Sequence, residues 1–156
     1  MKVLGIDPGY ARLGWGVIEV IGSRTRMIAC GCFETPKEEE LGVRLAFLNE
    51  ELIRIIELYQ PNDIAIEELF FAKNTKTAMS VAAARGIILM RGYYHSGRIF
   101  EYKPNQVKLA TTGTGSADKK QIQYMVTKIL GLDTIPKPDD AADALAIAIT
   151  HAAHTR

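Results

Sequence analysis

The sequence predicts an α/β domain built on a mixed β-sheet with helices on both faces. Two observations indicate this class. The first 35 residues form three segments rich in strand-forming residues, and from residue 41 onward helical and strand patterns alternate. Neighbouring strands followed by alternating helices and strands are typical of a sheet that combines antiparallel and parallel pairs. With 156 residues, 47% of them hydrophobic, the chain is expected to form one domain over residues 1–156.

The N-terminal part is expected to be an antiparallel meander of three strands. The apolar run KVLGID at residues 2–7 is stopped by Pro8 and Gly9, which indicates a buried strand that ends in a turn. GWGVIEVI at 14–21 and RMIACGCFET at 26–35 are rich in strand formers and are separated by a Gly-Ser pair.

Helices and strands alternate in the rest of the chain. Apolar residues recur every three or four positions over 41–59, which predicts an amphipathic helix ended by Pro61. The further predicted elements are a strand at 63–68, an alanine-rich helix at 75–93, a strand at 98–102, helices at 104–111 and about 117–130, and a final helix that follows a proline-rich loop. The first turn of that final helix carries three acids, Asp139, Asp140 and Asp143.

Composition limits where the protein works and what it binds. No apolar run reaches the ~18 residues that span a bilayer, and the N-terminus lacks the pattern of a signal peptide, so a cytoplasmic location is expected. Cys30 and Cys32 lie two apart on a predicted strand and share one face. Neither a disulfide nor a zinc site is expected of them, and we interpret them as small strand residues.

Charge is distributed unevenly although the net charge is only +1. Residues 1–68 carry a net charge of −5, residues 69–128 carry +8, and residues 129–156 carry −2. A basic middle between acidic ends is typical of a protein with one surface for a polyanion and another with clustered carboxylates. A solvated basic face without a partner is the alternative interpretation.

The acids fall at positions where an α/β sheet gathers functional groups. Asp7 ends the first predicted strand, Glu67 ends the fourth, and Asp140 and Asp143 stand near the start of the last helix. Oxygen ligands of this kind favour Mg²⁺ or Mn²⁺, and carboxylates that hold two divalent ions are a device for phosphoryl displacement. Taken singly, each acid has a simpler explanation, as a turn residue or as a favourable charge at a helix N-terminus.

Several motifs occur together in register: GIDPG, AIEELFFAKN, ARGIIL, EYKPNQVK, GTGSADKKQIQYMV and DDAADALAIAITH. Together they closely resemble the RuvC family of bacterial Holliday junction resolvases, which has the RNase H-like fold, over residues 3 to about 151. The resemblance implies a five-stranded mixed sheet with its second strand antiparallel. It further implies a homodimer that cuts two opposed strands of a four-way DNA junction symmetrically and leaves 5′-phosphate and 3′-hydroxyl ends. Two Mg²⁺ ions per active site, replaceable by Mn²⁺, and branch-migration proteins as partners are implied as well.

The resemblance also assigns roles to single residues. It places the catalytic, metal-binding acids at Asp7, Glu67, Asp140 and Asp143. It implies DNA contacts at Phe70, Lys73, Asn74, Lys108, Ser116 and Lys119. Ser116 is further expected to cap the following helix, and Phe70 to stack on unpaired bases unless it is part of the core. Glu68 is interpreted as structural, since strand side chains alternate between faces.

Alternatives stay open at this point. Asp139 is expected to face outward, as a cap or a solvated residue, although spacing alone does not choose between Asp139 and Asp140 as partner of Asp143. The small residues of helix 75–93 suit either a dimer interface or the core. Another RNase H-like nuclease, or a junction-binding module without catalysis, are the rival functions; an actin-like ATPase would need a second large domain.

Overall fold

The computed structural model describes residues 1–68 and 75–155, which form a five-stranded sheet between two layers of helices. The strands are β1 (Lys2–Asp7), β2 (Arg12–Ile21), β3 (Arg24–Glu34), β4 (Asp63–Glu67) and β5 (Ile99–Tyr102). The helices are α1 (Leu41–Tyr59), α2 (Thr75–His95), α3 (Pro104–Thr112), α4 (Lys119–Ile129) and α5 (Asp139–His154). In the described ranges no helix is both long and apolar enough to cross a membrane.

The sheet has the order β3-β2-β1-β4-β5. β2 runs antiparallel to both β1 and β3, whereas β4 pairs parallel with β1 and β5 parallel with β4. The predicted meander and the single antiparallel second strand are therefore confirmed. Because β1 and β4 are parallel neighbours, their carboxyl ends lie at the same edge of the sheet.

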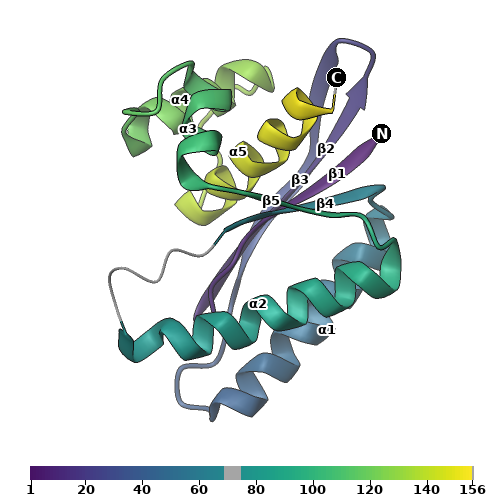
Figure 1. Ribbon diagram of the computed structural model, residues 1–156, viewed down its shortest axis with the longest axis vertical. Helices are drawn as coiled ribbons and strands as arrows, with labels where there is room; N and C mark the ends of the chain where they lie inside the picture. Colours follow the sequence, from purple (N-terminus) through teal and green to yellow (C-terminus); the bar gives the residue numbers. More distant parts are fainter. Residues whose placement is uncertain (69–74, 156) are drawn as a thin grey trace.

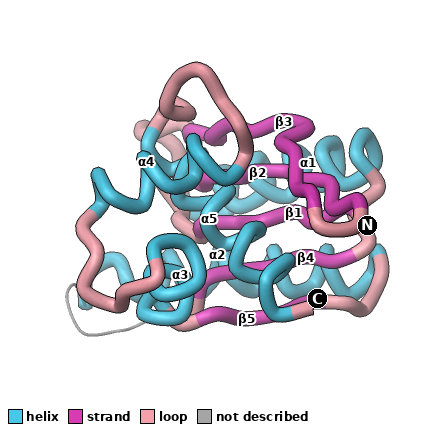
Figure 2. Tube along the Cα trace, turned by 90° about the horizontal axis from the view of Figure 1, so that it is seen from above, coloured by secondary structure: helices cyan, strands magenta, loops and turns pink. Residues whose placement is uncertain are grey.

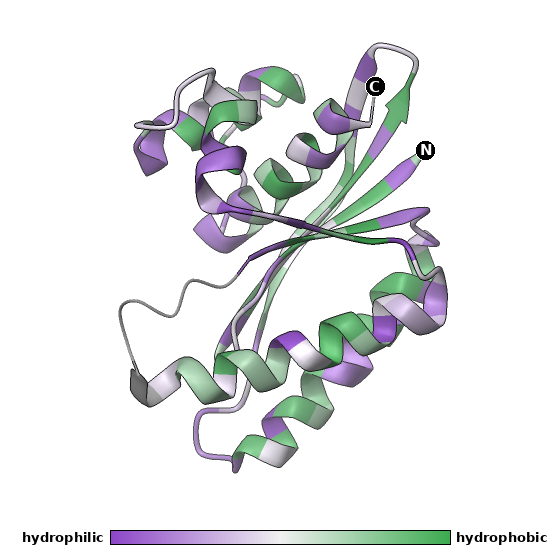
Figure 3. Cartoon of the chain, in the orientation of Figure 1, coloured by the Kyte–Doolittle hydropathy of each residue, from purple (hydrophilic) through white to green (hydrophobic). Residues whose placement is uncertain are grey.

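Each face of the sheet is covered by its own helices. α1 and α2 lie on one face, and α3, α4 and α5 lie on the other (Figure 1; the same layers are seen from above in Figure 2). Alternate residues of β1 separate the two cores: Val3 packs with α5, whereas Leu4 and Ile6 pack with α1 and α2. The central strands are apolar over most of their length, as expected for strands buried on both faces (Figure 3).

α5 lies unusually close to the sheet because glycines face it. A Cβ built on Gly5 would lie 2.1 Å from the carbonyl oxygen of Ala144, and one built on Gly14 would lie 2.1 Å from that of Asp140. Such separations are impossible for real atoms, so only glycine permits this approach. The same contact carries the first turns of α5 to the edge where β1 ends.

A buried polar chain fixes the other half of α5. The imidazole of His151 lies 2.8 Å from Asp63 Oδ2 through Nε2 and 2.8 Å from Tyr102 Oη through Nδ1. His151 and Asp63 are fully buried, so these bonds satisfy groups that water does not reach. α5 is thus attached at its C-terminal half to both β4 and β5.

The elements begin and end close to their predicted positions, with one difference that matters for the site. β2 begins at Arg12, two residues earlier than the sequence pattern indicated, because Arg12 pairs in register with Glu34 of β3. Cys30 and Cys32 are free thiols on β3, as expected.

Candidate active site

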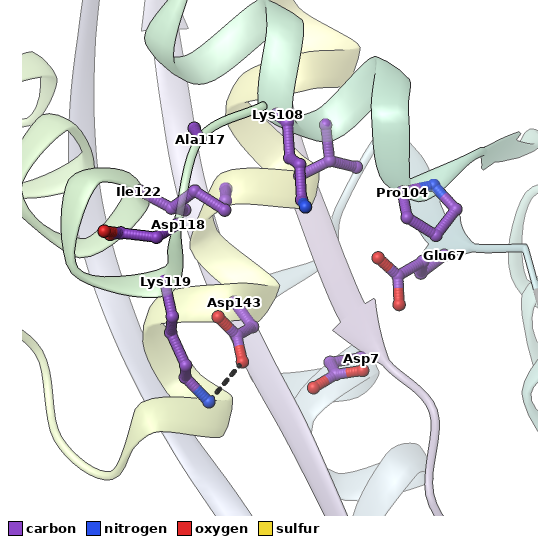
Figure 4. A pocket seen from close by; sticks show the side chains of 11 residues that line it. Asp7, Glu67, Pro104, Lys108, Ala117, Asp118, Lys119, Ile122 and Asp143 are labelled. Carbon is purple, nitrogen blue, oxygen red and sulfur yellow. Dashed lines mark ion pairs between the residues drawn. The ribbon is translucent and has the colours of Figure 1, made fainter. Parts of the chain in front are cut away.

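A pocket of about 280 Å³ lies where the carboxyl ends of β1 and β4 meet the first turns of α5. Asp7, Glu67 and Asp143 contribute their carboxyl groups to it, from β1, β4 and α5 respectively (Figure 4). The basic side chains of Lys108, from α3, and Lys119, from α4, complete its polar lining. Residues 136 positions apart in the sequence therefore meet in one cavity of mixed charge.

Strand alternation explains why these acids share a face. Val3, Gly5 and Asp7 project from β1 toward α5, and Ala65 and Glu67 do so from β4. Glu68 follows the end of β4, where its backbone N–H donates to the carbonyl of Tyr102 at 2.8 Å.

The carboxyl groups of the pocket resist ionisation. Burial, followed by the charges of Glu67, Asp143 and Asp140, raises the pKa of Asp7 from 3.8 to about 7. Burial and the charge of Asp143 raise the pKa of Glu67. Burial also raises the pKa of Asp143, although Lys119 acts in the opposite direction. The site is thus short of positive charge, which is the condition that favours binding of a cation.

Two basic side chains supply part of that positive charge. Lys119 Nζ lies 3.2 Å from Asp143 Oδ2 and 3.4 Å from Asp139 Oδ2. Arg12 Nη2 lies 3.2 Å from Asp140 Oδ2. These ion pairs explain how three acids can crowd the first turn of one helix.

Asp140 lies beside the pocket. It lines a neighbouring hollow with Arg12, Lys119, Lys137 and Asp139, yet it is close enough to raise the pKa of Asp7. The structure thus brings Asp7, Glu67 and Asp143 together, and it places Asp140 at their margin.

Asp139 was expected to be a helix cap or a solvated residue, and only the second expectation is confirmed. Its side chain is 61% exposed, against 28% for Asp140 and 30% for Asp143. The N-cap of α5 is Pro138, and Asp139 is the first residue of the helix. Its Oδ1 accepts a hydrogen bond of 2.9 Å from Gln123 Nε2, which draws it toward α4.

The expectation that Ser116 caps α4 is wrong. The N-cap is Asp118, whose side chain accepts from the N–H of Gln121 while Gln121 bonds back to the N–H of Asp118. This reciprocal capping box satisfies two backbone donors at once and so outcompetes a lone serine. Ser116 instead lies 3.0 Å from the hydroxyl of Thr114 in the exposed turn before the helix.

The donor chemistry of the pocket suits a hard divalent cation such as Mg²⁺, since its ligands are carboxylates with raised pKa values. Over residues 1–68 and 75–155, however, no three His, Cys, Asp or Glu side chains are arranged closely enough to hold a metal ion as they stand. Binding would therefore require side-chain rotation, including the release of Asp143 from Lys119.

Three predicted DNA contacts, Phe70, Lys73 and Asn74, lie outside the described residues. Sequence reasoning missed Arg12 and Lys137, which stand beside the acids. Arg12 had a detectable signal: it lies two and four residues before Gly14 and Gly16, so it shares their strand face, the one against which a helix packs closely.

Comparisons with known proteins agree over nearly the whole chain. A Thermus thermophilus RuvC solved in complex with a Holliday junction substrate superposes with a TM-score of 0.94 at 36% identity, covering 100% of this chain and 95% of that one. The yeast mitochondrial Holliday junction resolvase, 13% identical, shares the fold with a TM-score of 0.69 over 95% of this chain and 77% of that one. The fold is therefore the RNase H-like fold of the junction resolvases.

The sequence comparisons narrow this class to one family. The family model described as crossover junction endodeoxyribonuclease RuvC matches residues 3–151. The RuvC of Desulforamulus reducens is 53% identical over 152 residues, which is 97% of this chain and 93% of that protein. The RuvC of Thermotoga petrophila is 46% identical over 156 residues, 100% of this chain and 94% of that protein. The chain belongs to the RuvC family.

Proposed function

We propose that this protein is a Holliday junction resolvase, an endodeoxyribonuclease that hydrolyses one phosphodiester in each of two opposed strands of a four-way DNA junction. The observation that carries the proposal is the pocket in which Asp7, Glu67 and Asp143 meet Lys108 and Lys119. It lies in a chain that matches, over its full length, a RuvC solved with a Holliday junction substrate.

The pocket and its margin supply the parts that phosphodiester hydrolysis needs. Asp7, Glu67, Asp143 and, from the margin, Asp140 are the proposed ligands of Mg²⁺, with Mn²⁺ as a substitute. Two such ions, when bound, make a water molecule more acidic and stabilise charge on the leaving 3′ oxygen. The product ends are then a 5′-phosphate and a 3′-hydroxyl.

The basic residues have a separate task, which is to bind and orient the DNA strand. Lys108 and Lys119 face the carboxylates across the pocket (Figure 4). Their charges offset the repulsion between the acids and a phosphate, and so allow a negatively charged backbone into an acidic site. Ser116, in the exposed turn before α4, is a further proposed DNA contact.

Symmetric cleavage of two strands requires two active sites, and we propose that α2 joins two copies of the chain. A stripe along this helix is exposed: Met79, Ala82, Gly86, Met90 and Tyr93. The opposite face packs on the core through Ala84 and Ile88. A four-way junction has two-fold symmetry, and an isologous dimer presents two identical sites to it.

Cleavage and binding assays test the proposal. Wild-type protein should bind a four-way junction more tightly than a linear duplex and should cut it only when Mg²⁺ is present. Asp7→Asn and Glu67→Gln should bind the junction normally and fail to cut it. Cleavage within about tenfold of wild type in either variant would remove these acids from the mechanism.

A further inference from the structure

A second group of basic residues adjoins the candidate active site. Arg12, Lys119 and Lys137 line a hollow whose remaining walls are Pro138, Asp139 and Asp140. Lys119 also lines the active-site pocket. A DNA strand held with one phosphate at the pocket therefore has its neighbouring backbone directly over this hollow.

Arg12 stands at the junction of hollow and site because of the strand that carries it. Arg12, Gly14 and Gly16 project from the same face of β2, and the two glycines let α5 lie against that strand. The guanidinium consequently reaches the first turn of α5. About half of the Arg12 side chain, 47%, remains exposed to solvent.

The ion pairs of Arg12 are loose enough to exchange. Nη2 lies 3.2 Å from Asp140 Oδ2 and 3.4 Å from Glu34 Oε1, which are the long end of the range for a charged hydrogen bond. Cys32 also bonds to the Arg12 side chain. Glu34 is 65% exposed, so Asp140 is the partner that links Arg12 to the acids of the site.

One guanidinium edge cannot serve a carboxylate and a phosphate at the same time. In the protein without metal, Asp140 holds Arg12, and releasing it would leave one more unpaired negative charge beside Asp7. A divalent cation at the carboxylates removes that cost, because it neutralises Asp140 itself. Arg12 then becomes free at the edge of the hollow.

We propose that Arg12 is a substrate-binding residue that exchanges partners: it pairs with Asp140 in the metal-free protein and with a DNA backbone phosphate once a divalent cation is bound. The inference rests on the proposed function and adds a phosphate subsite, formed by Arg12 with Lys137, next to the cleaved bond. It also makes metal binding and DNA binding favour each other. By linkage, the factor by which metal tightens DNA binding equals the factor by which DNA tightens metal binding.

Junction affinity measured with and without Ca²⁺ tests the exchange, provided that Ca²⁺ occupies the carboxylates without supporting cleavage. The variant is Arg12→Gln, which removes the charge and keeps a polar side chain. Arg26→Gln is the matched control, since Arg26 is also exposed on the β2–β3 ribbon and also pairs with a glutamate, Glu19, at 2.6 Å. Fluorescence anisotropy over a salt series gives both the affinity and the salt slope.

With Ca²⁺, Arg12→Gln should weaken junction binding about five- to tenfold and lower the salt slope by roughly 0.9, the value for one lost phosphate contact. Without metal its affinity should stay within about twofold of wild type. Calorimetry without DNA should show that the variant binds Ca²⁺ more tightly than wild type, because no internal cation competes for Asp140. Arg26→Gln should match wild type throughout.

The opposite results are equally clear. An equal loss of affinity with and without Ca²⁺ would make Arg12 a constant DNA contact and overturn the exchange. Unchanged affinity and salt slope in both conditions would reduce Arg12 to a counter-ion of Asp140. Both results leave the proposed function intact, whereas a wild-type protein without preference for four-way junctions would contradict the proposed function itself.

Discussion

The carboxyl group of Asp7 has the environment that depends most on a bound cation. It ends β1 in a partly buried position, and Glu67, Asp143 and Asp140 all act to keep it protonated. Because folding brings these acids together, ionising them costs stability that the unfolded chain does not lose. The site therefore opposes the stability of the protein that contains it whenever no cation is bound.

The pH dependence of stability in metal-free buffer follows from this. The folded-state pKa of Asp7, about 7, lies above its ordinary value of 3.8. Its contribution is fully present below about pH 4 and is lost as the pH rises toward 7, a loss of roughly 2–4 kcal/mol. Asp7→Asn does not ionise, so it should be more stable than wild type by about that amount at pH 8, with the difference vanishing near pH 4.

Urea unfolding with EDTA at pH 4, 6 and 8 measures this difference. Asp133→Asn, which removes an exposed acid outside the site, is the control for the loss of one negative charge. If the advantage of Asp7→Asn were the same at every pH, repulsion within the site would not be its cause.

The three acids of α5 should separate into two that are needed for cleavage and one that is not. Asp139→Asn should cut junctions at nearly the wild-type rate, because Asp139 is mostly exposed and an asparagine oxygen can still accept from Gln123. Asp140→Asn and Asp143→Asn should lose Mg²⁺-dependent cleavage by roughly 100-fold or more. Single-turnover cleavage rates compare the three, and an inactive Asp139→Asn beside an active Asp140→Asn would shift the assignment by one residue.

At the scale of elements, the contact of α5 with β1 and β2 determines the geometry of the site. The helix carries Asp140 and Asp143, and it approaches the sheet only because Gly5, Gly14 and Gly16 face it. A change in this contact should displace two acids together, without touching either of them.

Gly14→Ala tests this dependence. Its Cβ would lie 2.1 Å from the carbonyl oxygen of Asp140, so α5 must move, at a cost of about 1–3 kcal/mol or more. Gly42→Ala in α1 is the control, since a Cβ there has nothing within 4 Å and should stabilise the helix by up to about 1 kcal/mol. Thermal unfolding should separate the two variants, and only Gly14→Ala should also lose cleavage at temperatures where it remains folded.

Sequence periodicity was sufficient to predict the elements, because apolar residues recur with the spacing of the helix or strand that buries them. The bounds of α1 were predicted to the residue. Local competition was harder to predict. The start of α4 depends on a reciprocal bond between Asp118 and Gln121 that spacing did not reveal, and the position of Arg12 depends on pairing with β3. Which acids share a pocket depends on strand order, which periodicity does not contain.

At the scale of the whole molecule, two copies must act together to cut both strands. The exposed stripe of α2 combines small residues, which permit close helix contact, with Met79 and Tyr93, which are 83% and 73% exposed. Burial of these side chains between two copies would stabilise a dimer by the hydrophobic effect.

A charge in this stripe should separate the copies. Gly86→Glu should convert the dimer to a monomer and abolish paired cleavage, since a buried unpaired carboxylate is costly. Leu58→Glu is the control, because Leu58 is also exposed, at 68%, on the neighbouring helix α1 but outside the stripe. Analytical ultracentrifugation distinguishes the two, and a dimeric Gly86→Glu would move the interface to another surface.

The way the chain passes through the site also bears on its synthesis. The first carboxylate belongs to β1 and the last two to α5, so more than 130 residues separate Asp7 from Asp140 along the chain. At ribosomal rates of 5–20 residues per second, roughly 7 to 30 s pass between the addition of these two residues. Throughout that interval a nascent chain lacks two of its four proposed ligands. A ribosome that stalls before α5 would release a fragment without nuclease activity, and the chromosome would be protected from an enzyme that is only partly made.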